Sequence, residues 1–375
     1  MNLKSLVTLV ATLLLTGCSN LSYYSQSITG QLDLMSKRRP ISEVAADETV
    51  PTATREKLLE VLKIRDFATR ELALPDNDSY RIYADLDRPY AVWNVFATPE
   101  FSLQPEQWCF LMVGCLAYRG YFDERDARLF AAGLKAEGKD VSVAGIRAYS
   151  TLGWFDDPVL NTFLDLPRHQ LAGLVFHELA HQQLYIDDDS AFNESFATAV
   201  QLAGVRRYLQ QYGEASERVA YADQQGRQGE FLALVSATRE QLVQLYANAE
   251  PDSGKRHAKA EIYQRMRMQY AALRDRWGDY RGYDAWFASD LNNAKLSAVA
   301  TYRSWVPAFA ALLENEHGDF AAFYRAAKRI GGLAPEERKQ RLAALSRDGS
   351  PVATRRSSRV DSGDPGTAAR PNRLP

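Results

Sequence analysis

The fold is decided by the stretch Leu171-Ala-Gly-Leu-Val-Phe-His177-Glu178-Leu-Ala-His181-Gln182. Its pattern predicts one amphipathic helix, on which residues four apart lie on the same face. His177 and His181 therefore share a face, and two imidazoles at this spacing can bind one zinc ion. Glu178 lies beside them, where a carboxylate can activate a water molecule. The motif thus predicts a zinc site built on a helix.

The neighbours of the motif favour a metal over two ordinary core histidines. Val175, Phe176 and Leu179 are uncharged and predict a helix buried on several sides, where unpaired imidazoles would be costly. A catalytic zinc needs a third protein ligand. A third histidine in an extended motif is disfavoured, because Leu184 and Asp187 occupy the required positions.

Glu194 is the predicted third ligand. It follows Asn193 near the start of another predicted helix, which Asp189 or Ser190 can cap. The alternative is a first-turn carboxylate that is favoured only by the helix dipole, with Asp188 or Asp189 as the replacement ligand. Asn193 is predicted to orient a ligand by a hydrogen bond.

The N-terminus is predicted to be an export signal and not part of the fold. Lys4 precedes an apolar segment, residues 6–15, that is too short to span a bilayer as a stable helix. Leu15-Thr-Gly-Cys18 then matches a bacterial lipobox, with a plain secretory signal as the alternative. Acyl chains on Cys18 would attach the protein to the lipid bilayer. Ser19 favours the outer membrane, with the protein facing the periplasm of the bacterial cell envelope.

Composition bounds the class of protein. The 375 residues carry a net charge of −2, so no basic excess indicates a nucleic acid partner. Three cysteines exclude a disulfide scaffold. Cys109 and Cys115 could form a disulfide in an oxidising compartment, or they could be two buried free thiols.

The predicted fold is α+β and predominantly helical. A small mixed or antiparallel sheet is expected beside the pair of site helices, followed by a helical bundle. The predicted parts are a signal peptide (1–17), a peptidase domain (18–347) and a disordered tail (348–375). Within the domain, residues 18–165 should hold the sheet and residues 166–347 the helices with the metal site. Strands are expected at 80–84, 90–96 and 140–146, and one long helix at 291–316 with Pro307 inside it.

The segment Ala148–Pro158 directly precedes the motif helix and has two interpretations. It could be an edge strand that binds an extended peptide substrate through its backbone, or an ordinary buried strand and turn. Asp156 and Asp157 within it, and Asp187 and Asp188 after the motif, are candidates to bind the free amine of a substrate.

These features resemble a family of bacterial lipoproteins described as predicted aminopeptidases. Five segments carry the resemblance: the lipobox, Ala148-Tyr149-Ser-Thr-Leu-Gly-Trp-Phe-Asp-Asp-Pro158, His-Glu-Leu-Ala-His, Phe-Asn-Glu-Ser-Phe-Ala and Leu291-Asn-Asn-Ala-Lys-Leu296. The resemblance extends from Cys18 to about Ile330. It implies a gluzincin-type peptidase with one Zn²⁺ per chain and Glu178 as general base, acting on a peptide or protein substrate.

Such an enzyme also needs a donor for the oxyanion of the tetrahedral intermediate. Tyr302 is the first candidate, Tyr149 the second and His257 the third. An envelope endopeptidase is the close alternative to an aminopeptidase. A catalytically silent zinc lipoprotein that binds envelope partners is the alternative outside the enzymes, and Glu178 distinguishes it because a binder does not need that carboxylate.

Overall fold

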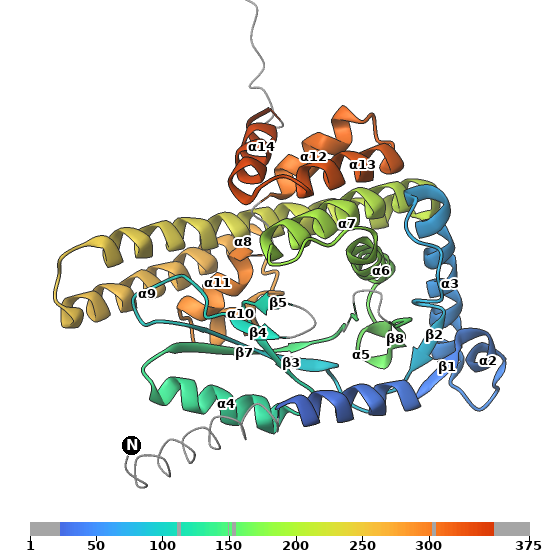
Figure 1. Cartoon of the computed structure of the whole chain (residues 1–375), viewed down its shortest axis with the longest axis horizontal. Helices are drawn as coiled ribbons and strands as arrows, with labels where there is room; N and C mark the ends of the chain where they lie inside the picture. Colours follow the sequence, from blue (N-terminus) through green and yellow to red (C-terminus); the bar gives the residue numbers. More distant parts are fainter. Residues whose placement is uncertain (1–22, 111–113, 149, 152–154, 302–304, 349–375) are drawn as a thin grey trace, which may run out of the picture.

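The computed structural model describes residues 23–110, 114–148, 150–151, 155–301 and 305–348. These residues form a mainly helical structure with small sheets of two or three strands (Figure 1). The predicted α+β fold with predominant helices is thereby confirmed. Within these ranges, no helix combines the length and the apolar composition needed to cross a bilayer.

The helices are spread over the whole described chain. An N-terminal helix covers residues 23–36. The helices that follow are α2 (Ile41–Ala46), α3 (Thr52–Leu72), α4 (Glu124–Ala136), α5 (Asn161–Leu164), α6 (Arg168–Gln183), α7 (Ser190–Tyr212), α8 (Ala215–Ala247), α9 (Asp252–Arg276), α10 (Asp284–Ala288), α11 (Asn293–Thr301), α12 (Val306–Asn315), α13 (Phe320–Gly331) and α14 (Pro335–Asp348).

The strands of the described residues form three small sheets, where one was expected. They are β1 (Arg38–Pro40), β2 (Ile82–Ala84), β3 (Val92–Thr98), β4 (Trp108–Phe110), β5 (Gly114–Leu116), β6 (Arg119–Tyr121), β7 (Asp140–Ile146) and β8 (Val159–Leu160). The sheet orders are β1-β2-β8, β6-β3-β7 and β4-β5. Only β2 and β8 pair in parallel, and the other pairs are antiparallel.

β3 is the central strand of the sheet β6-β3-β7. All of its residues are buried, and Val95 and Ala97 pack with Ala127 and Ala131 of α4. β7 pairs with β3 along its full length. It lies at the edge of this sheet.

The N-terminal helix and α4 lie along the lower edge of the molecule (Figure 1). The inner face of the N-terminal helix packs so closely on the sheet that a Cβ at Gly30 would lie 2.1 Å from Phe122 Cγ. Glycine is a poor helix former, but here it permits this close approach.

α6 and α7 run through the main apolar core. Phe176 of α6 packs against Phe67 of α3, with ring centroids 5.8 Å apart. Phe196 of α7 stacks on Phe323 of α13 at 5.6 Å. Both helices are therefore covered on more than one side, which fixes their positions relative to each other.

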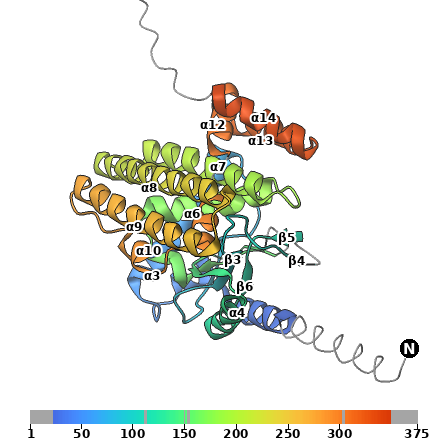
Figure 2. The same ribbon diagram turned by 90° about the vertical axis from the view of Figure 1, so that its left-hand side faces the viewer.

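α8 and α9 form a long antiparallel hairpin with a separate apolar core (Figures 1 and 2). Leu242 of α8 and Met266 of α9 are fully buried in this core, together with Leu296 of α11. α11 thus joins the hairpin to β3 and β7, which it also contacts.

The hairpin of β4 and β5 is closed by a disulfide between Cys109 and Cys115, which are directly opposed in its register. Of the two alternatives left by the sequence, the structure has the disulfide. The backbone N–H of Cys115 donates to Oδ1 of Asp188 at 3.1 Å. This hairpin therefore contacts the connection between α6 and α7.

Two predicted elements need correction. The single helix expected at 291–316 is two helices, α11 and α12, because Pro307 lies in the first turn of α12. A proline is tolerated there, since its missing N–H has no partner in a first turn. The strand expected from Tyr80 begins at Ile82, because Tyr80 has a positive φ of 63° that a strand does not allow.

Candidate metal centre

α6 supplies the two histidines. Val175, Phe176 and Leu179 are fully buried and hold the helix in the core. His177 and His181 follow each other by one turn, and their Nε2 atoms lie 3.2 Å apart. The helical spacing thus brings the two rings together as the sequence predicts.

α7 brings Glu194 to the same point. Its N-terminus is fixed by Asp189, whose side chain accepts a hydrogen bond from the N–H of Phe192 at 3.0 Å. Glu194 Oε2 lies 3.3 Å from His177 Nε2, and Oε1 lies 3.7 Å from His181 Nε2. The ligand atoms of these three residues all lie within 4.8 Å of one another.

Asn193 acts on the connection before α7 and not on a ligand. Its Oδ1 accepts from the N–H of Ile186 at 2.8 Å, and its Nδ2 donates to the carbonyl of Ile186 at 2.7 Å. Asn193 therefore does not make the predicted hydrogen bond to a ligand. It binds the backbone of the 184–189 connection instead, and this contact positions the first turn of α7, which carries Glu194.

The donor set fits a zinc ion. Two imidazoles and one carboxylate are a zinc ligand set that leaves a fourth position open. Nδ1 of His181 is buried and has no hydrogen-bond partner among the described residues. The two Nε2 atoms lie 3.2 Å apart, so one cation could accept a lone pair from each of them and a third from Glu194.

Gln201 fixes the orientation of one ligand. Its Oε1 accepts a hydrogen bond from Nδ1 of His177 at 3.2 Å. This contact assigns the proton to Nδ1 and leaves the lone pair of Nε2 for a metal. Gly173 makes room for it, because a Cβ there would lie 3.1 Å from Nε2 of Gln201. The sequence analysis missed Gln201, although its position two turns after Glu194 on the same helix is a signal that could have revealed it.

Burial and charge set the protonation of the histidines. Burial lowers the pKa of His177, but the carboxylates of Glu194 and Glu178 outweigh this and leave the pKa raised. Burial also lowers the pKa of His181, to about 4. Burial would raise the pKa of Glu194, but its hydrogen bond to His177 and the charges of both imidazoles lower it. His181 is thus a neutral ligand and Glu194 an ionised one at neutral pH.

Glu178 has the pKa of a general base. Burial raises its pKa to about 7, helped by the negative charges of Glu194 and Asp157 and opposed by His177. A base is most effective when its pKa lies near the operating pH. Glu178 adjoins His177 in the chain and remains partly accessible to solvent, so it can reach a water molecule beside the donor cluster.

A comparison with known protein families identifies the chain. The family model described as "Putative aminopeptidase" matches residues 22–342. The chain belongs to this family. No curated protein and no solved structure matches it. The family name suggests peptidase activity, and the cluster of His177, His181 and Glu194 could hold a metal ion.

Asp157 has a structural role in this aminopeptidase family member. It is buried, and its carboxylate accepts hydrogen bonds from the N–H and hydroxyl of Thr151 and from the hydroxyl of Ser150. The carboxylate of Asp157 is thus used to close the turn from Ser150 to Asp157, and not to bind a substrate amine as predicted. The described residues of 148–158 form this turn and no strand, and the strand that follows them before the motif helix is β8. Residues 149 and 152–154 lie outside the described ranges.

Tyr80 is a second residue that the sequence analysis missed. Its ring is buried, its φ is +63°, and its hydroxyl has no hydrogen-bond partner among the described residues. Burial and the charges of Glu178 and Asp157 raise the pKa of Tyr80 far above its usual range. A bulky residue in this backbone conformation is strained, and the ring lies close enough to Glu178 for the two groups to interact electrostatically.

The segment Leu291–Leu296 has an architectural role. Asn293 Oδ1 accepts from the hydroxyls of Tyr246 and Tyr263 at 2.9 and 2.7 Å. Its Nδ2 donates to the carbonyls of Glu100 and Ser102. Asn293 therefore connects α11 to the α8–α9 hairpin and to the loop after β3. These contacts give the segment Leu291–Leu296 a structural role that needs no part in catalysis.

The predicted oxyanion donors have different outcomes. Tyr302 and Tyr149 lie outside the described residues, as does Cys18. Trp305 follows Tyr302 by three residues, and its N–H donates to Oγ of Ser195 at 3.0 Å. Ser195 is the residue directly after Glu194. His257 is wrong as a candidate, because it lies on α9 with a side chain 81% exposed and paired with Glu261.

Proposed function

We propose that this chain is a zinc-dependent aminopeptidase in which His177, His181 and Glu194 bind the metal and Glu178 is the general base. The cluster of these three ligands beside a carboxylate of raised pKa carries the proposal. Each of the four residues comes from a fixed position on α6 or α7, and neither helix can shift without breaking core contacts.

The chemistry that zinc supplies when bound is Lewis acidity toward the scissile carbonyl and a lowered pKa of water at the open position. Glu178 accepts a proton from the attacking water and returns it to the leaving amine. Gln201 keeps His177 in the tautomer whose Nε2 is free to bind. Tyr302 is the proposed donor to the oxyanion, with Tyr149 as second choice.

The substrate amine of an aminopeptidase requires an acidic partner. Asp156 is half-buried, and Asp187 and Asp188 are exposed, whereas the carboxylate of Asp157 is occupied. Asp188 already accepts from Cys115, which leaves Asp156 and Asp187 as the proposed amine-binding residues. An endopeptidase would need neither.

We further propose that the mature chain begins at Cys18 and is held on the bilayer by acyl chains, on the periplasmic side of the outer membrane. The lipobox of residues 15–18 supports this location. Peptides of the cell envelope would then be the available substrates.

The test uses the soluble chain from Ser19 onward, with metal analysis and a library of peptides that carry free or acetylated N-termini. One zinc per chain and cleavage of free peptides alone are expected. Glu178→Gln should keep the zinc and lower kcat by about 10²–10⁴-fold. Full activity of Glu178→Gln would overturn the proposed mechanism, and cleavage of acetylated peptides would replace the aminopeptidase with an endopeptidase.

A matched pair of histidine variants tests the metal ligands. His177→Gln should lose the zinc, because it removes one of the three donors. His169→Gln on the same helix should keep it, because His169 contacts Gln224 and not the cluster. Equal zinc content in the two variants would refute the assigned site.

A further inference from the structure

The N-terminal helix (residues 23–36) exposes an apolar stripe. Tyr24, Ile28 and Leu32 lie four residues apart on its outer face, and their exposed fractions are 36%, 60% and 60%. On α4, which lies along the same edge of the molecule (Figures 1 and 2), Leu129 is exposed to 62%. These four side chains form what we term the lower face. Apolar groups in such a row mark an interaction surface.

The helix that carries the stripe is fixed to the body. Tyr23 lies under the guanidinium of Arg119 at 4.0 Å and stacks on Phe110. Gln26 Oε1 accepts from the N–H of Phe122 at 3.0 Å. The inner face is thus fully engaged with the body, and the stripe is presented outward by a helix that is held at several points.

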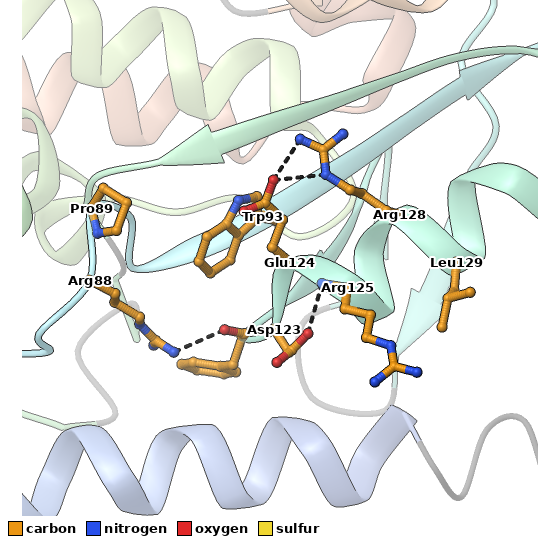
Figure 3. Close-up of a pocket in the computed structure, with 9 residues that line it drawn as sticks. Arg88, Pro89, Trp93, Asp123, Glu124, Arg125, Arg128 and Leu129 are labelled. Carbon is orange, nitrogen blue, oxygen red and sulfur yellow. Dashed lines mark hydrogen bonds and ion pairs between the residues drawn. The ribbon is translucent and has the colours of Figure 1, made fainter.

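A pocket of about 700 Å³ opens between the segment 88–93 and the start of α4, and Leu129 of the lower face is one of its lining residues. Figure 3 shows that Arg125 and Leu129 point from α4 toward the side of the N-terminal helix. The pocket is also lined by Arg88 and Arg128, and its floor includes Trp93.

The charges of the pocket favour an anion. Its acidic residues are Asp123, whose carboxylate caps α4, and Glu124, which pairs with Arg128. No ion pair to Arg125 is found in the described part of the chain. Arg88 donates to the carbonyls of Phe122 and Ala91 and keeps its positive charge. Arginine beside apolar side chains matches a phosphate group next to hydrocarbon.

The sequence places this face close to a bilayer. Only residues 19–22 separate Cys18 from Tyr23. Five residue steps span at most about 18 Å even when the chain is fully extended. Acyl chains on Cys18 would therefore hold the start of the N-terminal helix within that distance of the membrane surface.

We propose that the lower face is the membrane-facing surface of the protein. Ile28, Leu32 and Leu129 enter the interface, and Arg125 with its neighbours contacts the phosphates of an anionic phospholipid bilayer. This inference rests on the acyl anchor of the proposed function, and it adds an orientation. The lower face lies against the lipid, and α6 and α7, which carry the candidate metal ligands, lie on the opposite side of the sheet β6-β3-β7 from it (Figure 1).

The experiment uses the lipidated full chain in vesicles of phosphatidylcholine and phosphatidylglycerol that contain a nitroxide-labelled quencher lipid. A single environment-sensitive fluorophore is attached at Ile28→Cys or Leu129→Cys. Val243→Cys on α8 and Met268→Cys on α9 are matched controls, because these side chains are 56% and 58% exposed elsewhere. The acylated Cys18 and the bonded Cys109 and Cys115 leave the new thiol free to react.

Quenching at positions 28 and 129 should exceed quenching at positions 243 and 268 severalfold. Vesicles of phosphatidylcholine alone should reduce quenching at position 129, because the phosphate of this zwitterionic lipid is neutralised by its own choline and attracts the arginines less. Equal quenching at all four positions overturns the proposal. A blue shift at position 28 that grows with protein density and needs no lipid would show that a second copy covers the face, which also overturns it.

Two readouts separate this inference from the proposed function. Mass spectrometry of Cys18 reports the anchor, and an unmodified Cys18 would overturn the anchor and the lower-face inference together. Zinc content and peptide cleavage of the labelled chains report the enzyme. A chain that is quenched at position 28 but cleaves no peptide would refute only the peptidase.

Discussion

Gln201→Ala should weaken zinc binding without removing any ligand. The amide oxygen of Gln201 accepts from Nδ1 of His177 at 3.2 Å and holds the ring with Nε2 toward Glu194. Loss of such a contact to a metal ligand typically lowers metal affinity by about 10–100-fold, or about 1.4–2.7 kcal/mol. The zinc dissociation constant of the variant should rise by this factor.

The same loss should appear as a lower melting temperature at a fixed zinc concentration. A ligand that binds only the folded state stabilises it in proportion to the logarithm of its affinity. For residues 22–342, about 2.1 cal/mol/K per residue gives an unfolding entropy near 0.7 kcal/mol/K. The variant should therefore melt about 2–4 °C below the wild type in zinc, and at the same temperature in chelator.

The assay is competition for zinc against a chromophoric chelator, with thermal melts in parallel. Gln224→Ala is the matched control, because Gln224 makes the same kind of contact to His169, which is no ligand. Gln201→Glu should bind zinc at least as well as the wild type, since a carboxylate can accept the same hydrogen bond. A Gln201→Ala dissociation constant that equals that of Gln224→Ala would refute the role assigned to Gln201.

Three further predictions concern stability. Without metal, the raised pKa of Glu178, about 7, stabilises the fold as the pH falls from 7 to 4.5, and the lowered pKa of His181, about 4, destabilises it from 6.5 downward. These two pH dependences of the unfolding free energy nearly cancel in the wild type. Each variant removes one of them, so in urea melts with chelator Glu178→Gln should be less stable at pH 5 than at pH 6.5, and His181→Gln should be more stable. Each change should reach up to about 1.4 kcal/mol per pH unit. Gly30→Ala should destabilise the chain by about 1–3 kcal/mol, because its Cβ would overlap the ring of Phe122. The control Gly133→Ala should stabilise α4 by up to about 1 kcal/mol, because a Cβ there has no atom within 4 Å. Equal unfolding free energies of the two variants in urea melts would contradict this prediction. Asp157→Ala should cost about 2–4 kcal/mol, since it leaves the donors of the 150–157 turn unpaired, and an unchanged melting temperature would refute the structural role.

The three candidate metal ligands could be predicted from the sequence because the chemistry of metal binding restricts their spacing. His177 and His181 must be one helical turn apart to share an ion, and no other arrangement on one helix serves as well. Glu194 could be predicted for a related reason. Only a short connection separates α6 from α7, so the first turn of α7 lies close to the histidines of α6. Residue type and spacing together carry this information, and the structure brings the three side chains together.

Two of the supporting residues could not be predicted, because their partners are set by packing. Asp157 and Tyr80 are placed by turns and close approaches that no local pattern encodes, whereas the position of Gln201 two turns after Glu194 on α7 was a usable signal. Asp157 shows the difficulty, because an acidic residue near a peptidase motif suggests amine binding. Its burial and its hydrogen bonds from Ser150 and Thr151 follow only from the tertiary fold.

The helix boundaries at 291–316 show a different limit. Both segments have helical composition, and Pro307 is compatible with a kinked interior or with a new first turn. The deciding contacts are distant in sequence, since Asn293 is held by Tyr246 and Tyr263, and Trp305 donates to Ser195. Tertiary contacts on each side therefore separate two helices that local propensity joins.

The charges of the site link its chemistry to its stability. Glu178 and Glu194 are half-buried near the buried Asp157, and burial, followed by the negative charges of Glu194 and Asp157, raises the pKa of Glu178. The charge of His177 and a hydrogen bond from Ser150 lower the pKa of Glu178, and both imidazoles lower the pKa of Glu194. Buried like charges are costly unless a counter-charge is near. A dication at the donor cluster would supply that counter-charge and so stabilise the fold in the same place where it would enable hydrolysis. Burial and the nearby carboxylate of Glu194 thus give Glu178 its raised pKa, whereas the adjacent His177 lowers it.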